Sequence, residues 1–559
     1  MDVVFSKTGH FWIDVGIVGL HSILSKVDTI SIEVTQNSLI LSGEKEEIND
    51  ALEYARSVIE KRYYNVSTKK YNIYYDKKEE CFKRVPRINP TGIAKLIESK
   101  APAPVGEELK WGVKEDKDGN EKKVLPDKYS NLQEELDEFI KDCECKLPKK
   151  FLVDGTYYLS VGKKIELEEK KYKYNCIMCG QACTGGSHYK VSQAVFPLIT
   201  TTTGIKSFNA GAGTGEIACW KCHFVSKFVP VVGFFTKYFK NRNESMHIFL
   251  PYSSSLKKMI KTFNKLSSLR DEHENGACNF DLQKKDFDPE GKLKTFFEHF
   301  HETTFVFLYY LFKKLLNQKN AGLNKKNIEE HEEEREHKDL HGLIVEEGQL
   351  TFYVLEIIKQ NQRFATRALY PFKDSFYFYR LISYIESEDV DIKDVLRLLV
   401  NNQRRDSGKT ILRDKFCKRV LHKESVVDLV EKHIYTVKKT YIKPLFDFLM
   451  IYESIIKGGS KKMTDEEREV AVNVGSNVGM IVGKKQKRES DLFKLRKSRK
   501  LSNFLEQISR LQFKYGNCLY VNPEIYKGKL HESNFKEFKS FFMVSALNSF
   551  NYAQYKKGS

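Results

Sequence analysis

The hydrophobic pattern at the start of the chain alternates between helical and extended periods. The sequence GIVGLHSILSK (residues 16–26) has apolar positions at helical spacing and predicts a short amphipathic helix. Two apolar runs, TISIEV (29–34) and SLILSG (38–43), flank a polar TQN and predict a β-hairpin. Residues 46–65 return to helical spacing, with acidic residues first and basic residues last, an order that suits the helix dipole. Residues 1–100 are therefore expected to form an α/β region.

Changes in pattern and composition divide the rest of the chain into four regions. Residues 101–149 begin with a stretch rich in Pro, Gly and charge, which indicates a linker or an exposed excursion. Residues 150–235 contain a cysteine module, and residues 236–460 have mostly helical spacing and are expected to form a mainly helical body. Glycines near residue 458 mark the boundary to a basic C-terminal helical bundle at 461–559. Its apolar stripe has three-four spacing and consists of Leu501, Phe504, Leu505, Ile508 and Leu511. The expected fold class is α+β with several domains.

Composition and charge narrow the kind of partner. The chain has 559 residues, of which 41% are hydrophobic, so it can form several cores. Its formal net charge of +18 favours a polyanion as partner, either nucleic acid or an acidic membrane surface. Residues 461–559 hold 20 basic and 10 acidic residues, so much of this charge lies at the C-terminal end. The start lacks a signal-peptide pattern, and the longest apolar run, at 305–312, is too short for a membrane span. We expect a cytoplasmic nucleic-acid-binding protein.

Four of the eleven cysteines form two Cys-x-x-Cys pairs, Cys176 with Cys179 and Cys219 with Cys222. Each pair can chelate through one tight turn, and four thiolates suit tetrahedral Zn²⁺. Such a set leaves no open coordination position, so the zinc is expected to be structural. Alternative ligands are Cys183 and His188, and two unrelated buried pairs are the simplest competing interpretation.

A glycine-rich stretch, TTTGIKSFNAGAGTGE, lies between the two cysteine pairs at residues 201–216. Its glycines allow the backbone to approach a ligand closely, and Lys206, Ser207 and Asn209 could contact a phosphate or a base edge. Its spacing differs from the dinucleotide-binding G-x-G-x-x-G pattern. The segment is therefore either a motif-reading loop or a surface loop without a ligand.

The basic run at 484–500 is the sharpest electrostatic feature of the sequence. Apolar residues interrupt it, which indicates a folded helix rather than a free tail. Such a helix can neutralise phosphates without reading sequence, although a solvated basic face is the competing interpretation. A second, weaker patch is Arg404, Arg405 and Lys409. The candidate nucleic-acid contacts of the first patch are Lys484, Lys485, Lys487, Arg488, Lys494, Arg496, Lys497, Arg499 and Lys500.

Enzyme motifs are incomplete in this chain. The sequence SGKT at 407–410 ends like a P-loop, but Gln403 occupies the position that requires glycine. The sequence HEEEREH at 331–337 begins like a metalloprotease helix, but Arg335 replaces the second histidine. We therefore expect a protein without catalytic activity.

Three stretches together resemble a known family. They are GHFWIDVGIVGL at 9–20, the CIMC…CWKC pair, and DLFKLRKSRK with FLEQISRLQFKY at 491–515. In this order they are similar to the large subunit of the type I-B CRISPR interference complex (Cascade), in the branch that carries a Cys-x-x-Cys…Cys-x-x-Cys region. The resemblance in layout covers most of the chain, and residues 240–455 contribute little to it.

The resemblance implies a non-catalytic role in antiviral defence. The family's large subunit sits near the 5′ handle of the guide RNA, among the Cascade backbone subunits. It recognises the protospacer-adjacent motif in duplex DNA, helps to part the strands and stabilise the R-loop, and recruits a helicase-nuclease. The C-terminal bundle is similar to the family's small subunit, which an internal start at Met463 could also produce here. The alternatives are a zinc-knuckle RNA-binding scaffold and a zinc-dependent nucleic-acid enzyme.

Overall fold

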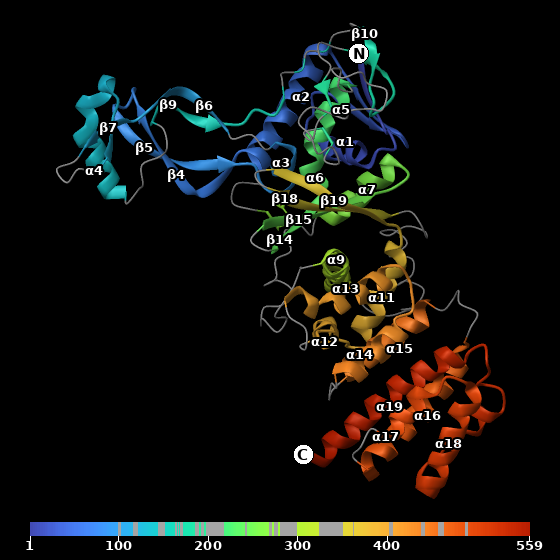
Figure 1. Ribbon diagram of the computed structural model, residues 1–559. Coiled ribbons are helices and arrows are strands. Elements are labelled where there is room, and N and C mark those ends of the chain that lie inside the picture. The colour runs from blue at the N-terminus through green and yellow to red at the C-terminus, as the bar shows by residue number, and fades with distance from the viewer. Residues whose placement is uncertain are drawn as a thin grey trace. The chain divides into compact units, whose positions relative to one another are not determined.

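A computed structural model shows a mixed α+β protein with several sheets and a cluster of four cysteines (Figure 1). The chain divides into two compact units, described separately below. The N-terminal unit comprises Met1–Asp281, His337–Val345 and Gln349–Lys373, and the C-terminal unit comprises Leu282–Glu336, Glu346–Gly348 and Asp374–Ser559. The structure describes residues 1–98, 102–115, 121–143, 151–162, 165, 167, 171–184, 189–191, 195–196, 217–240, 243–267, 271–272, 278–279, 299–323, 350–360, 363–401, 406–437, 442–456, 463–486 and 490–558.

The N-terminal unit begins with a three-stranded antiparallel sheet in the order β1-β3-β2. The predicted hairpin is confirmed, since Ile32 pairs with Leu41 across β2 and β3. Helix α2, which the sequence predicted, begins at a capping box between Glu44 and Glu47. The elements are β1 (Asp2–Ser6), α1 (Phe11–Leu24), β2 (Ser31–Val34), β3 (Ser38–Ser42) and α2 (Lys45–Ile59), which continues into a π-helical turn, Glu60–Tyr64.

Helix α1 is buried almost all round, whereas the sequence predicted an amphipathic helix. A Cβ atom on Gly16 would lie 2.1 Å from the carbonyl oxygen of Val225, and one on Gly19 would lie 2.3 Å from that of Phe228. Only a helix face without side chains permits such a close approach. The chain that follows the second cysteine pair therefore packs directly on the backbone of α1.

Four strands between residues 66 and 158 form a second sheet in the order β5-β4-β9-β6 (Figure 1). We call this sheet, together with the helix α4 that packs on it, the arm. The arm has its own small core, in which Ile73, Phe82 and Val153 pack against Leu136 and Phe139 of α4. Its elements are β4 (Val66–Asp76), β5 (Cys81–Asn89), β6 (Ala103–Leu109), β7 (Gly112–Glu115), β8 (Glu121–Val124), a 3-10 turn (Asp127–Leu132), α4 (Gln133–Cys143) and β9 (Phe151–Tyr158). Helix α3 (Gly92–Ile97) follows β5 in the chain but packs in the main core of the N-terminal unit.

The segment 101–149 was expected to be a linker or an exposed excursion, but its described residues form strands and a helix of the arm. Strand β6 pairs with β9, and the register shifts between Val105 and Glu107. Gly106 has a φ of +139° at this bulge, and a Cβ on Gly155 opposite would lie 1.7 Å from the carbonyl oxygen of Val105. The Pro- and Gly-rich composition thus marks a bulged edge strand, which has the same sequence signature as a linker.

A third, four-stranded antiparallel sheet has the order β14-β15-β18-β19. Apart from the first two residues of β14, this sheet lies in the region 236–460, which was expected to be mainly helical, so the prediction missed the sheet. The two central strands, β15 and β18, are about a hundred residues apart in the chain, so no local pattern links them. The elements are β14 (Phe234–Lys240), β15 (Asn243–Tyr252), α7 (Leu256–Ser267), β16 (Asp271–Glu272), β17 (Cys278–Asn279), β18 (Thr351–Gln360) and β19 (Arg363–Phe372).

The regular elements among the described residues of the C-terminal unit are all helices, joined by turns. In its first part, buried Arg413 and Glu302 form an ion pair of 2.5 Å, and Asp414 accepts the N–H groups of His301 and Glu302 at the start of α9. The helices of this part are α9 (Phe300–Leu323), α11 (Ser375–Ser387), α12 (Ile392–Leu398), α13 (Ile411–Leu421), α14 (Val427–Val437) and α15 (Lys443–Ile456), with a 3-10 turn at Asp406–Lys409.

The last part of this unit is a bundle in which α16 and α19 lie side by side (Figure 1). Three glycines at four-residue spacing, Gly475, Gly479 and Gly483, put the backbone of α16 against α19. The predicted apolar stripe is confirmed on α18, where Phe504 and Ile508 are buried. The helices are α16 (Asp465–Gln486), α17 (Ser490–Lys497), α18 (Leu501–Tyr515) and α19 (Phe535–Gly558), with 3-10 turns at Gly516–Cys518 and Pro523–Tyr526.

Candidate metal centre and nucleic-acid interface

The sulfur atoms of Cys176, Cys179, Cys219 and Cys222 all lie within 4.8 Å of one another. The Sγ atoms of Cys179 and Cys219 are 3.8 Å apart. Tetrahedral zinc with bonds of about 2.3 Å requires sulfur–sulfur separations of about 3.8 Å. The two predicted pairs therefore form one cluster whose size fits a four-coordinate metal ion.

The first pair lies in the turn between β10 (Lys171–Asn175) and β11 (Ala182–Thr184). Gly180 donates its N–H to the carbonyl of Cys176 at 2.7 Å, and its φ of +71° requires the left-handed region that glycine tolerates. Cys176 in turn donates its N–H to the carbonyl of Gln181 at 2.8 Å. This tight turn points both thiols of the pair to the same side.

The second pair lies at the start of helix α5 (Trp220–Val225), which follows β13 (Ile217–Ala218). Cys219 is the N-cap residue, and its sulfur accepts the N–H of Cys222 at 3.5 Å. The positive end of the helix favours a thiolate at this position. Ile177 of the first turn donates its N–H to the carbonyl of Ile217 at 3.0 Å, which joins the two turns.

The cluster lies in the main core of the N-terminal unit. Cys176, Cys219 and Cys222 are buried, and Cys179 is half-buried. Contacts among the four sulfurs lower the pKa of the Cys176 thiol and raise the pKa of the Cys219 and Cys222 thiols. A cation bound among them is therefore needed to make all four thiolates. Four thiolates fill a tetrahedral coordination sphere, which suits a structural ion better than a catalytic one. The donor set and the burial fit the zinc that the sequence predicted, and the identity of the ion stays a prediction.

The two alternative ligands differ in position. Cys183 is buried on β11 but is not part of the four-sulfur cluster, and His188 lies outside the described residues. The glycine-rich stretch 201–216, with Lys206, Ser207 and Asn209, also lies outside them.

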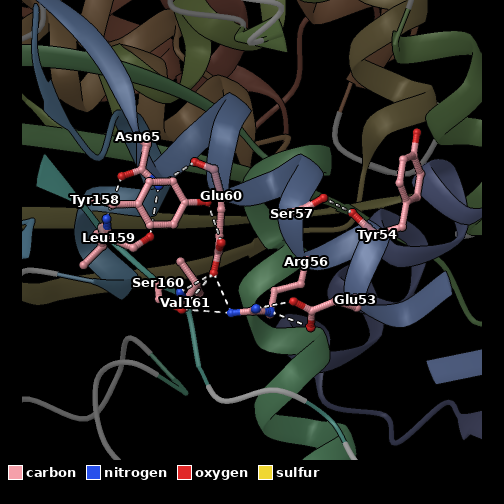
Figure 2. A network of polar contacts seen from close by, with 10 residues as sticks. All are labelled: Glu53, Tyr54, Arg56, Ser57, Glu60, Asn65, Tyr158, Leu159, Ser160 and Val161. Carbon is pink, nitrogen blue, oxygen red and sulfur yellow. Dashed lines mark hydrogen bonds and ion pairs between the residues drawn. The ribbon is translucent and has the colours of Figure 1, made fainter. Parts of the chain in front are cut away.

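A buried carboxylate fastens the base of the arm to the segment that leads to the cysteine module (Figure 2). Glu60 accepts hydrogen bonds from the Tyr158 hydroxyl at 2.7 Å and from the Val161 N–H at 2.6 Å, and it pairs with Arg56 at 2.9 Å. Burial and the hydrogen bond to Glu60 raise the pKa of Tyr158, so the hydroxyl remains a donor. This network was missed at the sequence level because its partners lie about a hundred residues apart.

Asn65 completes the network where the chain enters the arm. Its side-chain oxygen accepts the N–H of Leu159 at 2.7 Å, and its side-chain nitrogen donates to the carbonyl of Leu159 at 3.0 Å. The two strands at the base of the arm are thus joined by side-chain contacts as well as by the sheet (Figure 2).

Replacing Glu60 with alanine is expected to destabilise the base of the arm by about 3 kcal/mol or more, because it leaves Arg56, the Tyr158 hydroxyl and the Val161 N–H without their buried acceptor. Hydrogen exchange of residues 60–66 and 158–162 in the full chain measures the effect. Glu53→Ala is the matched control, since Glu53 lies on the same helix and pairs with Arg56 but is more exposed. Equal protection in both variants would contradict an anchoring role for Glu60.

Most described members of the basic segment face solvent. Lys484 and Lys485 are exposed at the end of α16, and exposed residues on and after α17 are Lys494, Lys497, Arg499 and Lys500. The structure thus places these six candidate nucleic-acid-binding residues on the surface of the C-terminal bundle. Lys487 and Arg488 lie outside the described residues.

Arg496 has a different environment from its neighbours. Its Nε is 3.1 Å from a carboxylate oxygen of Glu431 on α14, and its guanidinium lies 4.1 Å from the ring centroid of Tyr435. These contacts hold α17 against α14, so this side chain has a packing role.

In the second predicted patch Lys409 is half-buried, and Arg404 and Arg405 lie outside the described residues.

Comparison with known proteins leaves the family open. No protein-family model matches the chain, and a search of curated proteins finds no match. Within the described residues, no helix combines the length and the apolar character that crossing a membrane requires.

Proposed function

We propose that this protein is a non-catalytic, nucleic-acid-binding large subunit of a CRISPR RNA-guided DNA surveillance complex. In this role it contacts the 5′ handle of the guide RNA and the backbone subunits, recognises the protospacer-adjacent motif, aids strand separation, and recruits the helicase-nuclease. The proposal combines the resemblance of the three sequence stretches with the structure of the C-terminal bundle. Motif reading is assigned to loops of the N-terminal unit and strand holding to the bundle.

The exposed basic face of residues 484–500 is the single observation that carries the nucleic-acid part of the proposal. Six described cations face solvent within this short segment of a bundle that is otherwise well packed. Solvent-exposed cations at this density neutralise phosphates along a backbone, and they do so without reading sequence. A displaced DNA strand in an R-loop is a ligand of this kind.

The cysteine cluster supports a binding protein rather than a zinc enzyme. A zinc deaminase or nuclease needs a coordination position for water and a nearby acid-base group. Here four sulfurs occupy one closed cluster within the core. The proposed Zn²⁺ therefore acts as a staple that holds the two turns together against α1.

The position of Met463 is compatible with the proposed small subunit from an internal start. Helix α16 begins two residues later, and Thr464 and Glu467 form reciprocal hydrogen bonds of a capping box. A product from Met463 would retain α16 to α19. It would lack α14, whose Glu431 contacts Arg496 and Ser540 in the full chain.

Reversing the charge of Lys494, Lys497, Arg499 and Lys500 to glutamate is expected to weaken binding of single-stranded DNA about 100-fold near 0.1 M salt. The slope of log affinity against log salt should fall in magnitude by about 2 to 3, since each lost phosphate contact contributes about 0.7. Arg496 stays unchanged because it packs on α14. Fluorescence anisotropy titrations of the full chain at several salt concentrations measure both quantities.

The matched control reverses four exposed lysines outside this segment, namely Lys26, Lys61, Lys415 and Lys418. It changes the net charge equally and should leave most of the affinity and slope intact. The same loss in both variants would mean that net charge alone governs binding, and unchanged binding in the first variant would remove the strand-holding role.

The guide-complex assignment has its own test. A tagged chain purified from its native host should carry short RNAs of uniform length with a repeat-derived 5′ handle, together with backbone subunits. Heterogeneous structured RNA would instead support the zinc-knuckle RNA scaffold. Purification without RNA or partners would overturn the assignment to a surveillance complex.

A further inference from the structure

Two phenylalanines of the C-terminal bundle are turned to solvent. Phe493 on α17 is 45% exposed, and Phe513 on α18 is 92% exposed. Both helices also carry buried apolar side chains, among them Leu492, Phe504 and Leu511. The exposed phenylalanines lie outside the apolar stripe of α18, and each ring presents apolar surface to solvent.

These two residues belong to the same end of the α17–α18 helical hairpin. The buried carboxylate of Asp491 accepts hydrogen bonds from the Lys514 ammonium at 2.6 Å and from the Tyr515 hydroxyl at 2.7 Å. The start of α17 is thus fixed beside the end of α18. Phe493 follows Asp491 by two residues, and Phe513 directly precedes Lys514.

The surroundings of the Phe493 ring are cationic, and Lys514 directly follows Phe513 in the chain. The Lys497 ammonium lies 4.6 Å from the ring centroid of Phe493, and Lys494 beside it is exposed. Lysine is depleted from the cores of protein–protein interfaces, so a protein partner fits this surface poorly. Cations interleaved with exposed aromatic rings instead fit a ligand that has both phosphates and accessible base faces.

We propose that Phe493 and Phe513 stack on unpaired bases and make this bundle selective for single-stranded over double-stranded nucleic acid. Cations alone do not give this selectivity, because both forms present phosphates. In a duplex each base already stacks on its neighbours, whereas a single strand offers bases that can turn onto a ring. The inference rests on the proposed nucleic-acid-binding function and adds to it the form of the ligand.

The double variant F493L/F513L tests the proposal in the full chain. Leucine keeps the helical propensity and removes the flat ring, and neither position is needed for the core. The affinity for an oligothymidine should fall about 5- to 50-fold, by analogy with aromatic stacking in other single-strand binders, while the affinity for a duplex of equal length and the salt slope stay unchanged. The control is Tyr384→Leu on α11, an aromatic residue of 48% exposure elsewhere in the same unit.

A measurement on the unaltered chain gives an independent test that does not depend on how the variant folds. An abasic strand of the same length has the same phosphates without bases, so it should bind about as weakly as oligothymidine binds to F493L/F513L. Equal affinity for the abasic strand and for oligothymidine would overturn the proposal.

Comparison with the four-glutamate variant separates this inference from the proposed function. If charge reversal weakens binding but F493L/F513L keeps the preference for single strands, stacking is wrong and strand holding stands. If the phenylalanine variant loses duplex and single-strand affinity equally, the rings have no selective role and the proposal is also wrong. If neither variant changes binding, the nucleic-acid function of the bundle fails, and the stacking proposal fails with it.

Discussion

Replacing Cys222 with serine is expected to remove the bound metal and to unfold the cysteine module locally. The hydroxyl of serine is a poor ligand for zinc, and three remaining thiolates close to one another repel when the ion is lost. Structural zinc sites contribute about 10–16 kcal/mol in small peptides, so even a fraction of that value exceeds the stability of one module. The effect should spread to α1, because the end of α5 packs on Gly16 and the turn that follows α5 packs on Gly19.

Metal content and hydrogen exchange together measure this outcome. The purified chain should hold about one zinc ion, and the Cys222→Ser variant should hold almost none. Exchange should accelerate in residues 171–184 and 217–232 and in α1, while the C-terminal unit keeps its protection. A regional measurement is needed because a chain with two compact units has no single unfolding midpoint.

Two cysteine controls make the result specific. Cys518→Ser changes an exposed thiol far along the sequence and should leave metal content and exchange unchanged. Cys183→Ser tests the alternative ligand, and it should retain the metal because Cys183 is not part of the four-sulfur cluster. Loss of metal in Cys183→Ser with retention in Cys222→Ser would reverse the ligand assignment.

Local periodicity accounts for the parts of the fold that the sequence predicted. The β2–β3 hairpin joins neighbouring strands through a short turn, and α2 has both a capping box and charges that suit its dipole. The apolar stripe of α18 repeats every three or four residues, and its members Phe504, Ile508 and Leu511 are buried as predicted. In each case the information lies within one window of about twenty residues.

The missed elements depend on partners far along the chain. Strand β6 has the composition of a linker, and only its pairing with β9 makes it a strand. The central pair of the third sheet, β15 with β18, likewise joins segments separated by other structure. The burial of helix α1 was also missed for this reason. Its glycines allow another segment to pack on it, but the sequence of α1 alone does not show which segment that is.

The candidate sites divide in the same way. The cysteine cluster was predictable because each Cys-x-x-Cys turn already places two ligands, and only the meeting of the two turns is nonlocal. The Glu60 network was not, because one glutamate in a helix resembles any other until Tyr158 and Val161 reach it. Arg496 shows that a basic run in sequence can contain a side chain with a packing role.

Substituting leucine for Gly479 is expected to separate α16 from α19 and to disrupt the C-terminal bundle. A Cβ at this position would lie 1.9 Å from the carbonyl oxygen of Ala546. The other nearest atoms also belong to the backbone of Ala546 in α19, so no flexible side chain can move aside to make room. Gly475 and Gly483 meet Phe542 and Phe550 in the same way, at 2.3 Å and 2.9 Å. Overpacking of this kind costs about 1–3 kcal/mol for one added group, and a whole leucine side chain costs more.

The smaller change Gly479→Ala tests the same contact through the sign of its effect on stability. In an open helix, alanine in place of glycine stabilises by about 1 kcal/mol, because glycine loses more backbone entropy on folding. Close contact with Ala546 predicts the opposite, namely faster hydrogen exchange in both α16 and α19 and earlier proteolytic release of the bundle. Asn477→Ala, at an exposed position of the same helix, should leave both unchanged or slightly improved. A stabilised Gly479→Ala variant would mean that the two helices are farther apart, and that the bundle is held by its side chains rather than by backbone contact.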